Sequence, residues 1–194
     1  TGTFDVTITD DEDGTFTYAS TEYCKSGSNP TPTVTGTTGG TFSSTAGLSI
    51  NGSTGEINIA ASTAGTYTVS YVTSSNLCAV TGTFDVTITD DEDGTFTYAS
   101  AEYCVSGSDP TPTISGTTGG TFSSTAGLSI NASTGEIDLS ASTAGTYTVS
   151  YLTSSNLCAV TGTFDVTITA DEDGTFSYAS TQPSQTIYFE GFTG

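Results

Sequence analysis

Residues 81–89 read TGTFDVTIT, and the same segment stands at residues 1–9 and at residues 161–169. Within it Phe84, Val86 and Ile88 alternate with polar residues, which is the pattern of a strand with one buried and one exposed face. The copies are spaced 80 residues apart. A strand that recurs at a fixed spacing predicts an array of like β-rich units.

The rest of the repeat predicts further short strands. Residues 1–80 and 81–160 differ at ten positions, and most of the changes are mild, such as Val34 to Ile114. Gly, Pro, Asn and Ser separate the other alternating runs, which are Thr15–Ser20, Thr31–Thr35, Thr41–Ser44, Leu48–Ile50, Ile57–Ile59 and Thr66–Thr73. About seven short strands per repeat, with no helical pattern, are typical of a two-sheet sandwich. The predicted fold class is therefore all-β, with tandem immunoglobulin-like β-sandwich repeats of period 80 and one intra-repeat disulfide each.

Acidic segments set the predicted domain boundaries. We expect residues 1–14 to be the final strand and linker of a preceding repeat, and residues 15–94 and 95–174 to be complete repeats, each followed by an acidic linker. Residues 175–194 are expected to begin a divergent third unit, since Ser184 stands where Cys24 and Cys104 stand in the repeats.

The cysteines number four, with two in each repeat: Cys24, Cys78, Cys104 and Cys158. We predict the pairs Cys24–Cys78 and Cys104–Cys158, because a pairing inside each repeat keeps the units alike. Closing such a loop stabilises a fold by about 4 kcal/mol on the chain-entropy model. The alternative is four buried thiols, since neither His nor CxxC spacing indicates a metal. Disulfides predict a location outside the cytosol, extracellular or at the cell surface.

A resemblance to a known family rests on two stretches. The segments GLSINGSTGEINI and STAGTYTVSYV lie within Gly47–Val72, and their counterparts lie within Gly127–Leu152. They resemble the tandem immunoglobulin-like repeats of giant bacterial surface proteins, and the pattern with paired cysteines is similar to Bacteroidota-type cell-surface adhesins and extracellular filaments. The resemblance implies a stalk, spacer or adhesive segment, and it supplies no catalytic residues. The absence of Trp differs from antibody-type domains.

The charge balance excludes several classes of partner. Acidic residues number 21 against one basic residue, Lys25, for a formal net charge of −20. A nucleic-acid binder needs Lys and Arg to displace counterions from phosphates, so nucleic acid is excluded. An anionic membrane surface repels such a chain. We also expect no membrane insertion in this segment, because it has no run of about 18 apolar residues.

The strongest candidate for a ligand site is acidic, and calcium is the cofactor that it predicts. Two clusters lie at the predicted junctions between units: Asp10, Asp11, Glu12 and Asp13, and then Asp90, Asp91, Glu92 and Asp93. Calcium takes six to eight oxygen ligands, which clustered carboxylates can supply. The alternative is a solvated acidic linker that keeps neighbouring chains apart.

The predicted function is structural. The chain has no His and only one Lys, so the usual general bases are missing, and we expect no enzyme. We expect a structural repeat of an extracellular surface fibre or adhesin stalk; the alternative is an adhesive module that binds surface glycans or a partner protein. Self-association with like repeats is a further expectation, because the strand copy at residues 1–9 can complete a neighbour by strand addition.

Overall fold

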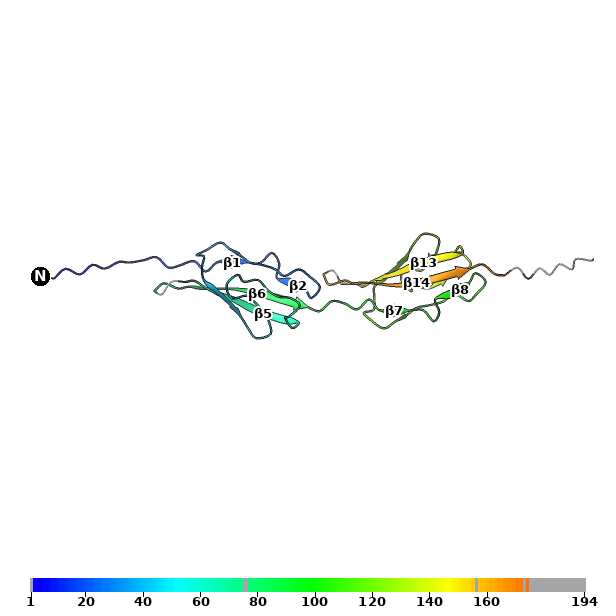
Figure 1. Ribbon diagram of the computed structural model, residues 1–194, viewed down its shortest axis with the longest axis horizontal. Helices are drawn as coiled ribbons and strands as arrows, with labels where there is room; N and C mark the ends of the chain where they lie inside the picture. Colours follow the sequence, from blue (N-terminus) through cyan, green and yellow to red (C-terminus); the bar gives the residue numbers. More distant parts are fainter. Residues whose placement is uncertain (1, 75–76, 156, 173, 175–194) are drawn as a thin grey trace, which may run out of the picture.

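The computed structural model describes residues 2–74, 77–155, 157–172 and 174, and throughout these residues the chain is all-β. Two folded units follow one another along one long axis, with extended chain before the first (Figure 1). The second unit is turned about that axis, so that β5 and β13 lie on opposite sides of the rod in this view. The described residues contain no helix of the length and apolarity needed to cross a membrane.

The strands are short, except for two in each unit. The first unit contains β1 (Phe16–Thr17), β2 (Glu22–Cys24), β3 (Thr33–Val34), β4 (Thr41–Ser44), β5 (Gly65–Val72) and β6 (Thr81–Thr89). The second contains β7 (Phe96–Thr97), β8 (Glu102–Cys104), β9 (Thr113–Ile114), β10 (Thr121–Ser124), β11 (Ser129–Ile130), β12 (Ile137–Asp138), β13 (Gly145–Leu152) and β14 (Thr161–Thr169).

The main sheet of each unit is built around its last two strands. β5 pairs antiparallel with β6 along the whole length of β5, from Gly65↔Ile88 to Val72↔Thr81. The sheet order is β2-β6-β5-β4 in the first unit and β8-β14-β13-β10 in the second. β2 runs parallel to β6, whereas β1 pairs antiparallel with β3 in a separate sheet. The early chain therefore contributes to both sheets of an immunoglobulin-like sandwich, and it leaves the end of β2 beside the end of β6.

The predicted inward faces of the long strands are confirmed. Tyr67, Val69 and Tyr71 of β5 are buried, and so are Val86 and Ile88 of β6, whereas Phe84 is half-buried and packs against them. They belong to one hydrophobic cluster in the first unit, and a matching cluster fills the second. The domain boundaries proposed from the sequence stay predictions, and the segment 175–194 lies outside the described residues.

The substitutions at positions 29 and 59 preserve an interior contact in both repeats. The side-chain oxygen of Asn29 accepts a hydrogen bond from the amide of Ile59 at 3.0 Å. In the second unit Asp109 accepts from the amide of Leu139 at 2.9 Å. Ile59 and Leu139 are both fully buried. These two substitutions thus retain the hydrogen bond and the apolar burial at their positions.

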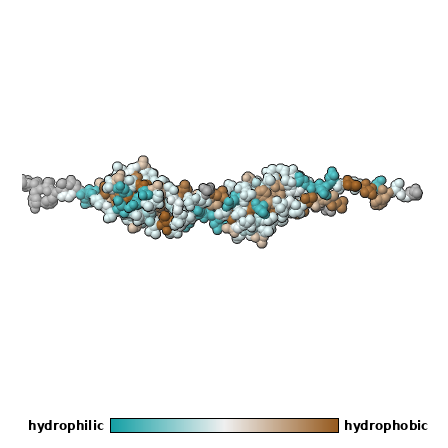
Figure 2. Space-filling view, turned by 180° about the vertical axis from the view of Figure 1, so that it is seen from behind, coloured by the Kyte–Doolittle hydropathy of each residue, from teal (hydrophilic) through white to brown (hydrophobic). Residues whose placement is uncertain are grey.

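The same strand sequence behaves differently at residues 2–9. Phe4 and Ile8 are 90% and 91% exposed there, whereas Ile88 in the second copy is 1% exposed. Figure 2 shows brown, apolar atoms along the extended segment that precedes the first unit. A strand of this type needs a neighbour like β5 for its hydrogen bonds and its burial, so context decides its state.

Aromatic rings occupy the centre of each unit, where a buried cystine lies in antibody domains. The ring of Phe42 lies 5.3 Å from that of Phe16 and 4.5 Å from that of Tyr71, centroid to centroid. The equivalent rings of the second unit repeat these two distances. The core therefore fills without sulfur.

The predicted disulfides Cys24–Cys78 and Cys104–Cys158 are wrong. Cys24 lies beside Thr89 at the end of β6, whereas Cys78 precedes the start of β6 at Thr81. A strand of nine residues is about 30 Å long, and a disulfide joins Cα atoms only about 4–7 Å apart. The two cysteines of a unit therefore lie at opposite poles. The disulfide that forms is Cys24–Cys158, and it joins the two units.

Candidate functional site at the junction between the units

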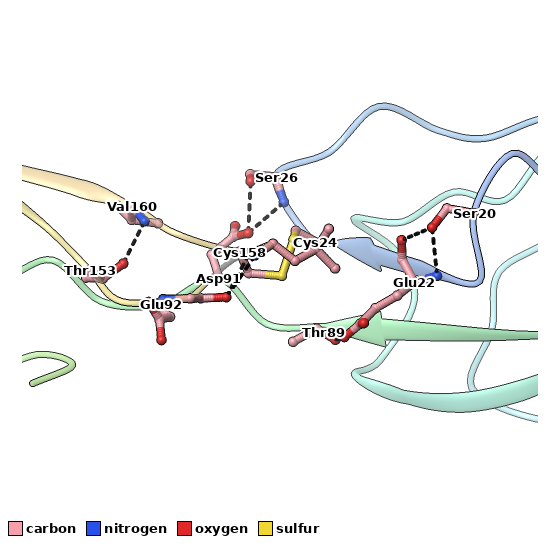
Figure 3. Close-up of a disulfide and its surroundings, with 12 residues drawn as sticks. Ser20, Glu22, Cys24, Ser26, Thr89, Asp91, Glu92, Thr153, Cys158 and Val160 are labelled. Atoms are coloured by element: carbon pink, nitrogen blue, oxygen red, sulfur yellow. Dashed lines mark hydrogen bonds between the residues drawn. A yellow bond between two sulfur atoms is a disulfide. The ribbon is translucent and has the colours of Figure 1, made fainter. Parts of the chain in front are cut away.

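A disulfide and an acidic linker together form the junction between the two units (Figure 3). Cys24 ends β2 at one pole of the first unit, and Cys158 lies in the loop between β13 and β14 of the second. Their Cα atoms are 5.4 Å apart although they are separated by 134 positions in the sequence. Cys158 is buried and Cys24 is half-buried.

The first half of the linker binds the first unit. The carboxylate of Asp91 accepts hydrogen bonds from the Ser26 hydroxyl at 2.8 Å and from the Ser26 amide at 3.3 Å. The carboxylate of Asp90 lies 3.9 Å from the ammonium group of Lys25. Both partners follow Cys24 directly in the sequence, so these contacts hold the linker against the loop that carries the disulfide.

The third linker residue binds the second unit. The carboxylate of Glu92 accepts a hydrogen bond from the Ser155 amide at 2.9 Å, and its amide donates to the carbonyl of Cys158 at 3.1 Å. The base of this loop is closed by Thr153, whose hydroxyl accepts from the Val160 amide at 2.8 Å. Glu92 therefore fixes the loop that presents Cys158 to the first unit.

The last two linker residues, Asp93 and Gly94, pack against the second unit. The carboxylate of Asp93 accepts from the Thr95 amide at 2.9 Å, and its carbonyl accepts from the Thr117 amide at 2.7 Å. Hydrogen bonds from the hydroxyl and the amide of Thr95 hold the pKa of Asp93 below its usual range. A Cβ atom at Gly162 would overlap the carbonyl oxygen of Gly94, so β14 and the linker meet backbone to backbone.

The carboxylates predicted to bind calcium thus lie at the junction but bind different donors. Each of these four carboxylates already has a protein partner: Asp90 and Asp91 bind Lys25 and Ser26 of the first unit, whereas Glu92 and Asp93 bind Ser155 and Thr95 of the second. In the first cluster Asp13 binds Thr15, as Asp93 binds Thr95. Within the described residues, the only group of three metal-capable side chains found close together is Cys24, Asp91 and Cys158, and its two sulfurs form the disulfide. The calcium site stays a prediction.

Sequence reasoning missed one signal of this junction. Lys25 is the only basic residue of the chain, and its counterpart in the second repeat is Val105. Its ionic partner Asp90 has the counterpart Ala170. Both members of the pair are replaced together, which indicates that these two positions, 65 residues apart, are in contact.

Comparisons with known proteins give distant structural similarity only. No protein-family model matches the chain, and no curated protein sequence matches it either. Among solved structures, it is similar to a SusE-like surface located polysaccharide binding protein of Bacteroides thetaiotaomicron, with 14% identity and a TM-score of 0.37 over 80% of this chain and 34% of that one. It is also similar to mouse cadherin-23 EC22-24, with 14% identity and a TM-score of 0.32 over 83% of this chain and 66% of that one. Human protocadherin-24 EC1-2 shows 11% identity and a TM-score of 0.36 over 81% and 98% of the two chains.

Proposed function

We propose that this chain is a structural segment of an extracellular surface fibre or adhesin stalk, in which successive units are locked end to end. The observation that supports the proposal most directly is the Cys24–Cys158 disulfide, which joins the facing poles of two consecutive units. A stable disulfide of this kind belongs outside the cytosol. The chain has no His and a single Lys, so the proposal includes no catalytic step.

The placement of the disulfide suits a segment that carries tension. Cys24 lies near the start of the first unit, and Cys158 lies just before β14, the last strand of the second. A pull on the two ends of the chain therefore passes from Cys24 to Cys158 through the sulfur atoms. The stretch from β3 to β13 lies inside the bypassed loop, so it is protected from extension.

The surface fits a spacer that stays separate from unrelated molecules. A net charge of −20 keeps a chain soluble and repels other acidic surfaces. The linker carboxylates are placed between the units, where they bind Lys25, Ser26 and Ser155. We propose that the chain's partners are like units of the same repeat.

Single-molecule pulling tests the proposal. The chain is held by its two ends and extended with the disulfide intact and again after reduction. Reduction should lengthen the fully unfolded chain by about 450 Å, since 134 positions at roughly 3.3–3.6 Å each are released. Cys24→Ser should behave like the reduced chain, whereas Cys78→Ser should behave like the oxidised parent. Equal lengths before and after reduction would remove the load-bearing role, and capture of the oxidised chain by a glycan array would then favour the adhesive alternative.

A further inference from the structure

The pole that carries Cys104 repeats the hydrogen bonds of the Cys24 side of the junction, without the ion pair between Lys25 and Asp90. The amide of Val105 donates to the carbonyl of Thr169 at 3.0 Å, as the amide of Lys25 donates to Thr89 at 3.0 Å. The Ser106 hydroxyl donates to Asp171 at 2.7 Å, which matches the contact between Ser26 and Asp91. Cys104 itself is an exposed thiol, and the hydroxyl of Thr169 lies 3.6 Å from its sulfur.

The pole that carries Cys78 is built like the Cys158 side. The amide of Glu12 donates to the carbonyl of Cys78 at 3.3 Å, where Glu92 donates to Cys158 at 3.1 Å. Cys78 is a half-buried thiol, whereas Cys158 is buried. The neighbouring Leu77 is 91% exposed, and its counterpart at the junction is 50% exposed. The same apolar residue is thus more covered where a second unit faces it.

We propose that Cys104 and Cys78 are complementary halves of further junctions, each taking the opposite cysteine of another unit of this repeat. Cys104 then pairs with the cysteine that corresponds to Cys158 in a following unit, and Cys78 pairs with the one that corresponds to Cys24 in a preceding unit. The pairing deepens the proposed function, on which its mechanical consequence rests, by naming the partner of each pole. Local contacts place both thiols as the closed junction requires, and the facing unit supplies the second sulfur.

Forming each bond needs an oxidant, and a small disulfide such as oxidised glutathione suffices. The thiolate of one cysteine attacks the oxidant's disulfide and releases one thiol, which leaves a mixed disulfide. The thiolate of the facing cysteine attacks that mixed disulfide and releases the second thiol. One disulfide forms, one is reduced to two thiols, and the two protons of the original cysteines pass to the products.

An array closed in this way can barely be stretched. In such an array, force passes from one disulfide to the next through the shortest stretch of chain that joins them. In each pair of units this stretch runs from the residue equivalent to Cys78 to the one equivalent to Cys104, 26 positions later. That segment contains β6 and runs from the outer pole of the first unit to the outer pole of the second (Figure 1). Its greatest length is about 90 Å at roughly 3.3–3.6 Å per residue. Two units with strands of about 30 Å, joined by an extended linker, already span most of that distance.

The test is a count of thiols in a lengthened chain. A second copy of residues 95–174 is inserted after Gly174 of the full chain, which gives six cysteines and one new junction. After oxidation by a glutathione buffer at low protein concentration, the chain is treated with a maleimide under denaturing conditions and weighed. The proposal predicts two reactive thiols. Four would show that only the Cys24–Cys158 junction closes, and none would show pairing inside each unit; either result overturns the proposal.

A matched pair of variants assigns the new bond. In the first, only Cys104 and the second cysteine of the inserted copy remain; in the second, only Cys104 and Cys158 remain, and every other cysteine is Ser in both. We expect a disulfide in the first variant and two thiols in the second, with the same thermal melt for both under reducing conditions. The reverse outcome overturns the proposal. Because these counts involve no force, the pairing can fail while the pulling result at Cys24–Cys158 stands, and the converse also holds.

Discussion

The two units have the same interior but differ at their poles. The rings of Phe16, Phe42 and Tyr71 pack at the same centroid distances as their counterparts in the second unit. The cysteines, in contrast, are in two states, since Cys24 and Cys158 form a disulfide whereas Cys78 and Cys104 are thiols. The difference lies in what faces each pole, because the sequences around the paired positions are nearly identical.

Some features of the poles form within a unit, whereas others depend on the neighbouring unit. The contact between Ser106 and Asp171 forms at an outer pole just as the contact between Ser26 and Asp91 forms at the junction. Burial, however, follows the neighbour, since Cys158 is buried and Cys78 only half-buried. The hydrogen bonds around each cysteine therefore form without a facing unit. The facing unit adds burial and the covalent bond.

The largest expected effect is on stability, from removing one sulfur of the junction. On the chain-entropy model, a loop of 134 positions gives a stabilisation of about 5 kcal/mol. Cys24→Ser should therefore lower the free energy of unfolding of the oxidised chain by up to about 5 kcal/mol. Urea unfolding followed by tyrosine fluorescence measures it.

Cys104→Ser is the matched control for that prediction. It makes the same chemical change at the equivalent position, where no second cysteine of the described residues pairs with it, so the free energy of unfolding should change by less than about 0.5 kcal/mol. Equal losses in the two variants would mean that the position matters for packing within a unit rather than for the junction.

The strand pattern could be predicted from the sequence, because it depends on local alternation. The runs that contain Tyr67, Val69 and Tyr71, and Val86 and Ile88, show which face is buried without reference to anything distant. The parallel pairing of β2 with β6 could not be predicted, since a strand of three residues has no period to measure.

The disulfide pairing was missed because the number of cysteines in each repeat does not show at which end of the unit each cysteine lies. A pairing inside each unit keeps the units alike, but so does a ladder in which each unit bonds to the next. Only the position of Cys24 beside Thr89, at the far end of β6 from Cys78, distinguishes the two. The acidic linker lies between the two units, and nothing in its composition shows that Asp91 and Glu92 bind donors on opposite sides.

A smaller effect is expected from the hydrogen bonds that hold the linker. Asp91→Ala removes both contacts to Ser26, and we expect a loss of about 1 kcal/mol, near the usual contribution of a partly exposed hydrogen bond. The equilibrium between the Cys24–Cys158 disulfide and glutathione should shift about five-fold toward the thiols. Asp171→Ala removes the equivalent contact at an outer pole and should leave that equilibrium unchanged. A similar shift in both variants would contradict the role of the linker in positioning the cysteines.

Acid should destabilise the two units to different extents, because two of their ten differences, Asn29 to Asp109 and Asn58 to Asp138, place a carboxyl group in the second unit. Hydrogen bonds from Ser140 and from the amide of Ala141 lower the pKa of Asp138 from its ordinary value of 3.8. A lowered pKa stabilises the fold above the unfolded value, and that stability is lost as pH falls through the folded value. The first unit has Asn58 at this position, which binds the Ala61 amide at 3.1 Å but does not titrate.

Below pH of about 4, the second unit should therefore lose more stability than the first. Asp13 and Asp93 also have lowered pKa values, but there is one in each unit, so they affect both alike. Hydrogen exchange of peptides from β5 and β13 measures the two units separately in one sample. Asp138→Asn should abolish the difference between them, and a difference that persists in this variant would assign the acid sensitivity to another group.

Calcium should have the smallest effect on stability. Its binding at the junction carboxylates can be compared with binding at the first cluster, Asp10–Asp13. The carboxylates of Asp91 and Glu92 are half-buried and already accept hydrogen bonds from the protein, so an ion must compete with Ser26 and Ser155 for them. For an extracellular site with a millimolar dissociation constant, one millimolar calcium then stabilises the fold by about 0.4 kcal/mol. Melting of the oxidised chain in calcium and in magnesium at equal ionic strength separates ion binding from screening of the net charge. A specific site requires a larger rise in melting temperature with calcium than with magnesium, and Asp91→Asn should remove that difference. Identical melting curves in the two salts would mean that the linker carboxylates bind only protein donors.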